Sequence, residues 1–184
     1  MNREDALNLV KSKVHNQNLV RHMMAVEACM RRLARHLEED EERWGLTGLL
    51  HDLDYETTNE DFSRHGLVTG EILRSYSIDP EIIHAIEAHP GHRQPGSRLD
   101  WALFSVDPTT GLIVAATLMH PSKDLREIDT EFVMRRFKER RFAAGANRDQ
   151  IRACSHLGLG LEEFITICIE GMRSVAEELG LAGR

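Results

Sequence analysis

A long apolar stripe with helical spacing is the feature that most constrains the fold of this chain. Apolar residues recur at alternating steps of four and three over residues 19–37, and they are Leu19, Met23, Val26, Met30, Leu33 and Leu37. This spacing puts one apolar face on an α-helix, whereas a half-buried strand would repeat every second residue. The stripe therefore predicts a long helix with one side in the core.

Shorter stripes of the same period occupy most of the remaining chain. A first helix is expected over about 3–14 behind the cap Asn2, and another approaches Leu53 from Trp44. Pro108 should bend or split the helical pattern around it, and Asn147 fits a capped helix start. Further apolar patterns predict helices over about 62–73, 80–88, 99–106, 112–119 and 164–179, the last ending at Gly180.

These patterns predict an all-α fold, a compact single-domain helical bundle spanning 1–184. The chain has 184 residues, 41% of them hydrophobic and 29% charged, which suits one buried core without a linker. Its three cysteines show no paired spacing, so a disulfide scaffold is excluded. The longest apolar run, over 112–116, is too short for a bilayer, and the amino terminus has no signal core. We expect a cytoplasmic protein without a membrane partner.

Ten histidines are the unusual part of the composition, and two of them lie at the edge of predicted buried faces. His22 lies three residues after Leu19, so its imidazole borders the apolar stripe. His51 and Asp52 follow Leu50 at the end of a predicted helix, where both could point toward one cation. The alternatives are a hydrogen-bonded core histidine and a helix-end pair in which the carboxylate accepts backbone hydrogen bonds.

A distant aspartate completes a candidate metal-ligand set. Asp107 follows Leu103 by four residues and therefore emerges from the packed side of its helix. Because Asp107 precedes Pro108, it could instead cap a new helix.

Taken together, these residues resemble the HD superfamily of metal-dependent phosphohydrolases. The family pattern is an early His, a His-Asp pair and a distant Asp, matched here by His22, His51-Asp52 and Asp107 within NLVRHMMAVE, GLLHDLDYE and ALFSVDPTTGLIVAA. The resemblance covers a metal-binding core of about 17–120 and leaves a helical extension of about 121–184. It implies an HD-type helical bundle that holds a divalent ion. The HDIG-like branch has Ile-Gly after the pair, whereas Leu53-Asp54 stands here.

Two more histidines match branches of the superfamily that hold a second metal. His65 and His89 lie between the pair and the last aspartate, and helical spacing turns both inward. The alternative is that both histidines are hydrogen-bonded polar residues packed between helices. We expect two ions bridged by Asp52, with His51 and Asp52 counted as catalytic. The metal ligands thus expected are His22, His51, Asp52, His65, His89 and Asp107.

Imidazole and carboxylate ligands suit one or two divalent ions, namely Mn, Fe, Co, Ni, Zn or Mg. Water bound to such ions ionises near neutral pH and attacks a phosphate whose charge the ions offset. No convincing Ser/His/Asp or Cys/His arrangement competes with this set. The chemistry expected is hydrolysis of a phosphate ester by metal-bound water.

The substrate phosphate also needs positive partners. Residues 135–148 carry six positive charges and one negative charge, although the formal net charge of the chain is −7. The negative net charge argues against general nucleic-acid binding. We therefore expect a small phosphorylated molecule as the substrate. Lys138, Arg141, Arg148 and the loop residue His92 are candidates for substrate binding, and Lys123 for orienting the substrate at the catalytic centre. A solvated helix face is the alternative for the basic run.

The function predicted is a metal-dependent phosphohydrolase acting on a phosphate ester such as a nucleotide or a related metabolite. Two alternatives use the same residues. One is a di-iron oxygenase, because some proteins similar to this superfamily use a His and Asp set for oxidation. The other is a sensor module that binds metal or nucleotide without turnover.

Overall fold

Helices account for nearly all regular structure in the computed structural model, which describes residues 1–183. The α-helices are α1 Arg3–Lys13, α2 Gln17–Leu37, α3 Glu41–Leu50, α4 Tyr55–Thr58, α5 Leu67–Arg74, α6 Pro80–Ala88, α7 Arg98–Met119, α8 Thr130–Lys138, α9 Arg148–Arg152 and α10 Leu161–Arg173. Short 3-10 turns are η1 Phe62–Arg64, η2 Leu125–Glu127 and η3 Ala153–Leu157. Across 1–183 the only β pairing is one isolated bridge. The predicted all-α fold is confirmed.

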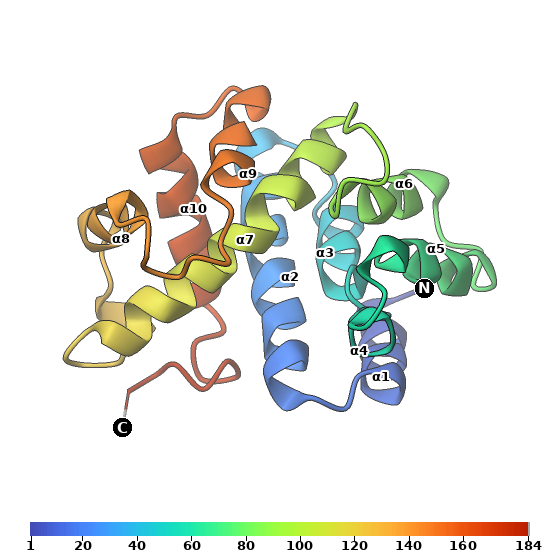
Figure 1. The fold of residues 1–184 in the computed structure, drawn as a ribbon, viewed down its shortest axis with the longest axis horizontal. Coiled ribbons are helices and arrows are strands. Elements are labelled where there is room, and N and C mark those ends of the chain that lie inside the picture. Colours follow the sequence, from blue (N-terminus) through green and yellow to red (C-terminus); the bar gives the residue numbers. More distant parts are fainter. Residues whose placement is uncertain (184) are drawn as a thin grey trace.

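The predicted apolar stripe becomes α2, the central helix of the bundle. Figure 1 shows α2 in the middle, with α3 beside it and α7 crossing it, and α10 also packs against it. Met23, Met30 and Leu33 are fully buried at these contacts. Asn16 caps the helix by accepting a hydrogen bond from the backbone N–H of Asn18 at 2.9 Å. The stripe therefore forms the core against which three other helices are positioned.

Helix α7 runs through Pro108 without a break, so the predicted splitting at this residue is wrong. Its start is a capping box, in which Ser97 and Asp100 each accept a hydrogen bond from the other's backbone N–H. Pro108 removes one intrahelical hydrogen bond, but Val106 and Leu112 on either side are completely buried. Tertiary packing holds the helix together across the proline. Asp107 is consequently inside a helix and is not the cap of a new one.

Two other predicted helices differ from their apolar patterns, one by an interruption and one by an early end. The helix expected over 62–73 is interrupted at Gly66, whose φ of +79° is left-handed and separates η1 from α5. The last helix ends at Arg173, and turns continue to Gly180, which also has a positive φ. The caps expected at Asn2 and Asn147 are confirmed.

One helix has the length and apolar composition that a membrane span requires. This helix is α7, and 56% of its most apolar stretch is buried inside the bundle. Burial of this kind is what the core helix of a folded domain shows.

Most glycines within the helices lie where a neighbouring backbone or side chain leaves no room for a Cβ. A Cβ at Gly45, Gly48, Gly70 or Gly171 would meet a neighbouring atom at 2.5 to 2.9 Å. At Gly171 of α10 that atom is the carbonyl oxygen of Ala28 in α2, at 2.7 Å. Gly111 of α7 differs, because no atom lies within 4 Å of its added Cβ.

The contact between α2 and α10 gives a first testable prediction. Gly171→Ala should destabilise the protein by about 1–3 kcal/mol, because its methyl group forces the two helices apart. The matched control is Gly111→Ala, which has open space and should gain up to about 1 kcal/mol from better helix propensity. Urea unfolding of both variants measures these changes. A Gly171→Ala protein as stable as the parent would contradict the close packing.

Candidate metal centre

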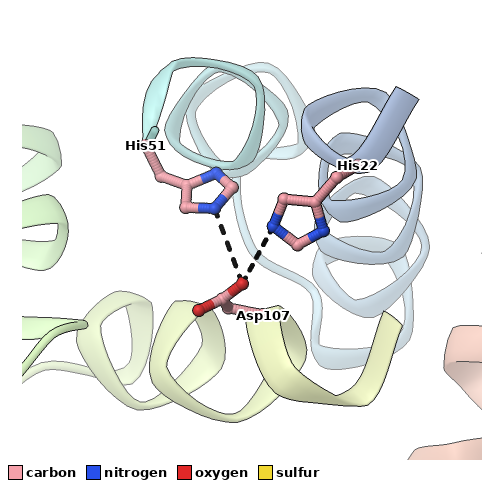
Figure 2. Close-up of side chains that lie close together, drawn as sticks. All are labelled: His22, His51 and Asp107. Carbon is pink, nitrogen blue, oxygen red and sulfur yellow. Dashed lines mark ion pairs between the residues drawn. The ribbon is translucent and has the colours of Figure 1, made fainter. Parts of the chain in front are cut away.

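Three side chains from three helices meet at the open side of a histidine and aspartate cluster. Figure 2 shows His22 of α2, His51 at the end of α3 and Asp107 of α7 pointing toward one another. Oδ1 of Asp107 lies 3.0 Å from Nε2 of His22 and 3.6 Å from Nε2 of His51. Helix packing thus brings together residues that are far apart in the sequence.

Asp52 lies at the centre of the cluster and faces histidines on two sides. Its Oδ1 is 3.3 Å from Nε2 of His51, 3.3 Å from Nε2 of His65 and 3.5 Å from Nε2 of His89. Its Oδ2 is 3.6 Å from Nε2 of His22. The structure therefore brings all six predicted metal ligands together.

Each of the four imidazoles is oriented by a partner at its other ring nitrogen. Nδ1 of His51 donates to the carbonyl of Gly48 at 2.8 Å, and Nδ1 of His89 donates to the carbonyl of Ile86 at 2.6 Å. Nδ1 of His65 lies 2.8 Å from the Asp54 carboxylate, and Nδ1 of His22 lies 3.2 Å from the Thr110 hydroxyl. Such partners are typical of metal-binding histidines, because they fix the ring and leave Nε2 for the ion.

Asp54 is a positioning residue that sequence reasoning missed. It is completely buried, and its Oδ2 accepts hydrogen bonds from the backbone N–H groups of Gly66 at 2.8 Å and Thr69 at 2.9 Å. Its Oδ1 accepts from His65. From the sequence, Asp54 was noted only because Leu53-Asp54 replaces the Ile-Gly of the HDIG-like branch. The available signal was a charged residue directly after the buried Leu53.

The cluster fits a divalent cation. Nε2 of His51 and Oδ1 of Asp52 are buried and have no hydrogen-bond partner, although they lie within ion-pair distance of each other. Nε2 of His65 and Nε2 of His89 are 3.2 Å apart. Two nitrogens bound about 2.1 Å from one ion lie roughly 3.0–3.4 Å apart at octahedral or tetrahedral angles. Potential ligand atoms that face one another without hydrogen-bond partners are typical of a metal site.

Mutual electrostatic interactions shift the pKa values of the clustered side chains. Burial opposes charge on His51, but the Asp52 and Asp107 carboxylates together outweigh it and raise the pKa of His51 well above its ordinary value. Burial acts in the same way on His65, while Asp52 and Asp54 raise its pKa to about 9. For Asp107, burial is outweighed by His22 and His51, which lower the pKa of its carboxyl.

A cleft of about 770 Å³ opens onto these ligands. One wall includes Tyr55 and Phe62, and another is the α7 surface at Pro108 and Gly111. The remaining lining residues outside the ligand cluster are Asn16, Asn18, Leu19, Pro90, Ala143, Gly145, Ala146, Asn147 and Gln150. Of the described residues that line the cleft, none is lysine or arginine.

The predicted substrate-binding cations lie outside this cleft. Lys123, Lys138, Arg141 and His92 are exposed and do not line it. Arg148 instead donates hydrogen bonds to backbone carbonyls, which include those of Phe142 at 2.6 Å and of Ala143 and Ala146 at 2.8 Å. It therefore organises the loop that forms one wall of the cleft.

Comparison with known proteins gives a family match and distant relatives. Similar proteins include Ribonuclease Y of Sulfurovum sp. (strain NBC37-1), 29% identical over 73% of this chain and 27% of the relative. Ribonuclease Y of Geobacter metallireducens (strain ATCC 53774 / DSM 7210 / GS-15) is 29% identical over 65% of this chain and 24% of its own. The chain thus spans about a quarter of these relatives. No solved structure matches it significantly. The HD domain family model matches residues 19–131, more than half of the chain and all six clustered ligands, so the chain belongs to the HD superfamily of metal-dependent phosphohydrolases.

Proposed function

We propose that this protein hydrolyses a small phosphate ester at a centre of one or two divalent ions. The observation that carries the proposal is the convergence of four Nε2 atoms on two carboxylates at the floor of a cleft. A divalent ion bound there acidifies water and offsets charge on a phosphate during in-line attack. Membership in the HD superfamily supports this reaction class.

The protein's own side chains have different parts in this proposal. His51 is fully buried, whereas the side chains of His22 and Asp107 are 25% and 28% exposed. The substrate therefore approaches from the His22 and Asp107 side. Asp52 presents one oxygen to His22 and the other to His51, His65 and His89, an arrangement that supports the bridging role proposed for it.

The substrate proposed is small. The relatives carry the name ribonuclease, which makes RNA the competing substrate class. Binding to a nucleic-acid backbone relies on many basic contacts, yet the described lining of this cleft has no lysine or arginine. This lack of cations favours a single phosphate ester over a long polyanion.

The six-ligand set favours a second candidate function, a di-iron oxygenase. Protein loaded anaerobically with Fe²⁺ and then given oxygen and a small organic substrate would oxidise that substrate and consume oxygen, without phosphate release, if this candidate were correct. Phosphate release from an ester under anaerobic conditions supports hydrolysis instead.

Asp52→Asn tests the metal centre directly. The amide keeps the shape of the side chain but removes the charge that four imidazoles face, so we expect bound metal and ester hydrolysis to fall together. Loss of the hydrogen-bond partner behind a metal ligand lowers metal affinity or activity about 10–100-fold. Loss of the ligand itself should therefore lower them by more than about 100-fold. Elemental analysis and phosphate release are the measurements.

The matched control for Asp52→Asn is Asp149→Asn, an exposed aspartate of α9 outside the cluster. It should keep the parent's metal content and activity. An Asp52→Asn protein with full metal and full turnover would rule out the assignment.

Metal uptake should depend on pH through His65. Its pKa of about 9 in the metal-free fold lies above the ordinary 6.5, so the ion must displace a proton up to about pH 9. Apparent Co²⁺ affinity should therefore rise between pH 6.5 and 9. The stability that this protonation gives the metal-free protein is present below pH 6.5 and lost as the pH rises through about 9. Calorimetry in buffers of different ionisation enthalpy counts the released protons, and uptake without proton release would contradict this prediction.

Asp54→Asn tests the orientation of His65. We expect metal affinity to fall about 10–100-fold, because the His65 ring loses its charged partner. Thr57→Ala is the comparison, since its hydroxyl donates a hydrogen bond to the backbone carbonyl of Asp54 at the start of α4 and makes none to His65 or to the Asp54 carboxylate. Equal metal affinity in both variants would show that Asp54 has no part in positioning the ligand.

A further inference from the structure

Two large aromatic side chains are exposed at the cleft and are not packed into the core. Tyr55 is 42% exposed and Phe62 is 54% exposed, and both line the cleft. Their ring centroids are 6.2 Å apart and nearly perpendicular. Exposed aromatic rings at a pocket offer a stacking surface for a flat ligand group.

The aromatic pair lies directly beside the metal centre. The ring centroid of His65 is 4.6 Å from that of Phe62 and 5.4 Å from that of Tyr55. Nε2 of His65 faces Asp52 at 3.3 Å. A molecule whose phosphate reaches the clustered ligands therefore has an aromatic surface next to that phosphate.

Gly111 provides a second and independent sign that the substrate is more than a phosphate. It lies one helical turn beyond Asp107, on the same face of α7, and it lines the cleft. A Cβ at any of the other helix glycines would meet a neighbouring backbone or side-chain atom within 3 Å, whereas a Cβ at Gly111 would meet no atom within 4 Å. Glycine weakens a helix, so a reason outside the fold is needed. Space for a bound molecule above α7 is such a reason.

The size and charge of the cleft restrict what that molecule is. A volume of about 770 Å³ falls in the range of about 300–1,000 Å³ that organic ligands occupy, well above the needs of a phosphate alone. Apart from the clustered ligands, the described lining consists of uncharged residues, which are aromatic, amide, leucine, proline, alanine and glycine residues. Nothing there would neutralise a second phosphate or an acidic group.

We propose that the cleft binds a single phosphate ester of an uncharged, ring-containing alcohol, with its ring on Tyr55 and Phe62 and with room secured by Gly111. This inference rests on the proposed function and specifies the substrate class of the same site. It makes Tyr55, Phe62 and Gly111 residues that determine specificity.

The test uses the metal-loaded protein and two esters, benzyl phosphate, which has a ring, and ethyl phosphate, which has none. We expect kcat/KM to be at least about tenfold higher for benzyl phosphate, consistent with the stacking of one ring. Tyr55→Ala and Phe62→Ala should reduce this preference to about threefold or less, mainly through KM. Phe62→Leu keeps apolar bulk over His65, so it separates loss of the ring from disturbance of the metal ligand.

Tyr76→Ala is the matched aromatic control, because Tyr76 is 48% exposed but does not line the cleft. It should keep the parent's preference and metal content. A benzyl preference that survives in both Tyr55→Ala and Phe62→Leu would overturn the aromatic subsite, as would its absence in the parent.

Gly111→Leu tests the space above α7. Leucine is a good helix former, so folding should be retained while benzyl phosphate turnover falls at least about tenfold and ethyl phosphate turnover changes much less. Gly96→Leu, which also has open space but does not line the cleft, should change neither. Unchanged benzyl phosphate turnover in Gly111→Leu would overturn the role of Gly111.

Binding of benzylphosphonate and ethylphosphonate separates this inference from the proposed function, because neither compound can be hydrolysed at an ester bond. Tighter binding of benzylphosphonate, lost in the Tyr55 and Phe62 variants, supports the subsite even if no ester is turned over. Turnover of both esters at equal rates, with equal binding of both phosphonates, keeps the hydrolase and rejects the subsite. Faster cleavage of an RNA oligonucleotide than of benzyl phosphate would also overturn the proposal.

Discussion

The burial of the Asp52 carboxylate among four imidazoles is the constraint on which the structure depends. Asp52 is 4% exposed, and a carboxylate in such a place needs compensating charge or hydrogen bonds. No backbone amide occupies its Oδ1, which faces ring nitrogens only. A metal cation compensates the buried Asp52 charge better than protons on the histidines do, because one ion can bind several of these ligand atoms at once.

Close helix packing makes that arrangement possible. A Cβ at Gly48 would come within 2.9 Å of the Glu27 backbone nitrogen, so α3 can lie this near to α2 only with glycine there. The carbonyl of the same Gly48 accepts the hydrogen bond that turns His51. The centroids of the His22 and His51 rings are 5.2 Å apart as a result. One residue thus sets both the distance between two helices and the orientation of a ligand.

Much of the fold could be predicted from the sequence because it depends on local spacing, and the period of the stripe predicts α2. The cluster was expected from the resemblance of His22, His51-Asp52 and Asp107 to the HD superfamily pattern, with His65 and His89 added from its two-metal branches. The predicted split at Pro108 was wrong, because a prediction from local sequence counts the lost hydrogen bond but not the burial of the helical turns on either side. Asp54 was missed because its partners, Gly66 and Thr69, become neighbours only after folding. Arg148 is similar, since charge alone does not tell that backbone carbonyls surround it.

The segment organised by Arg148 has a consequence for how such a protein diversifies. The cleft is partly lined by Ala143, Gly145, Ala146, Asn147 and Gln150, which lie beyond the 19–131 stretch shared with the superfamily. Every clustered ligand lies inside that stretch. The metal ligands and this wall of the cleft are therefore encoded in separate portions of the chain. Drift in the carboxyl-terminal portion can reshape one wall of the cleft while the inherited ligand cluster stays intact.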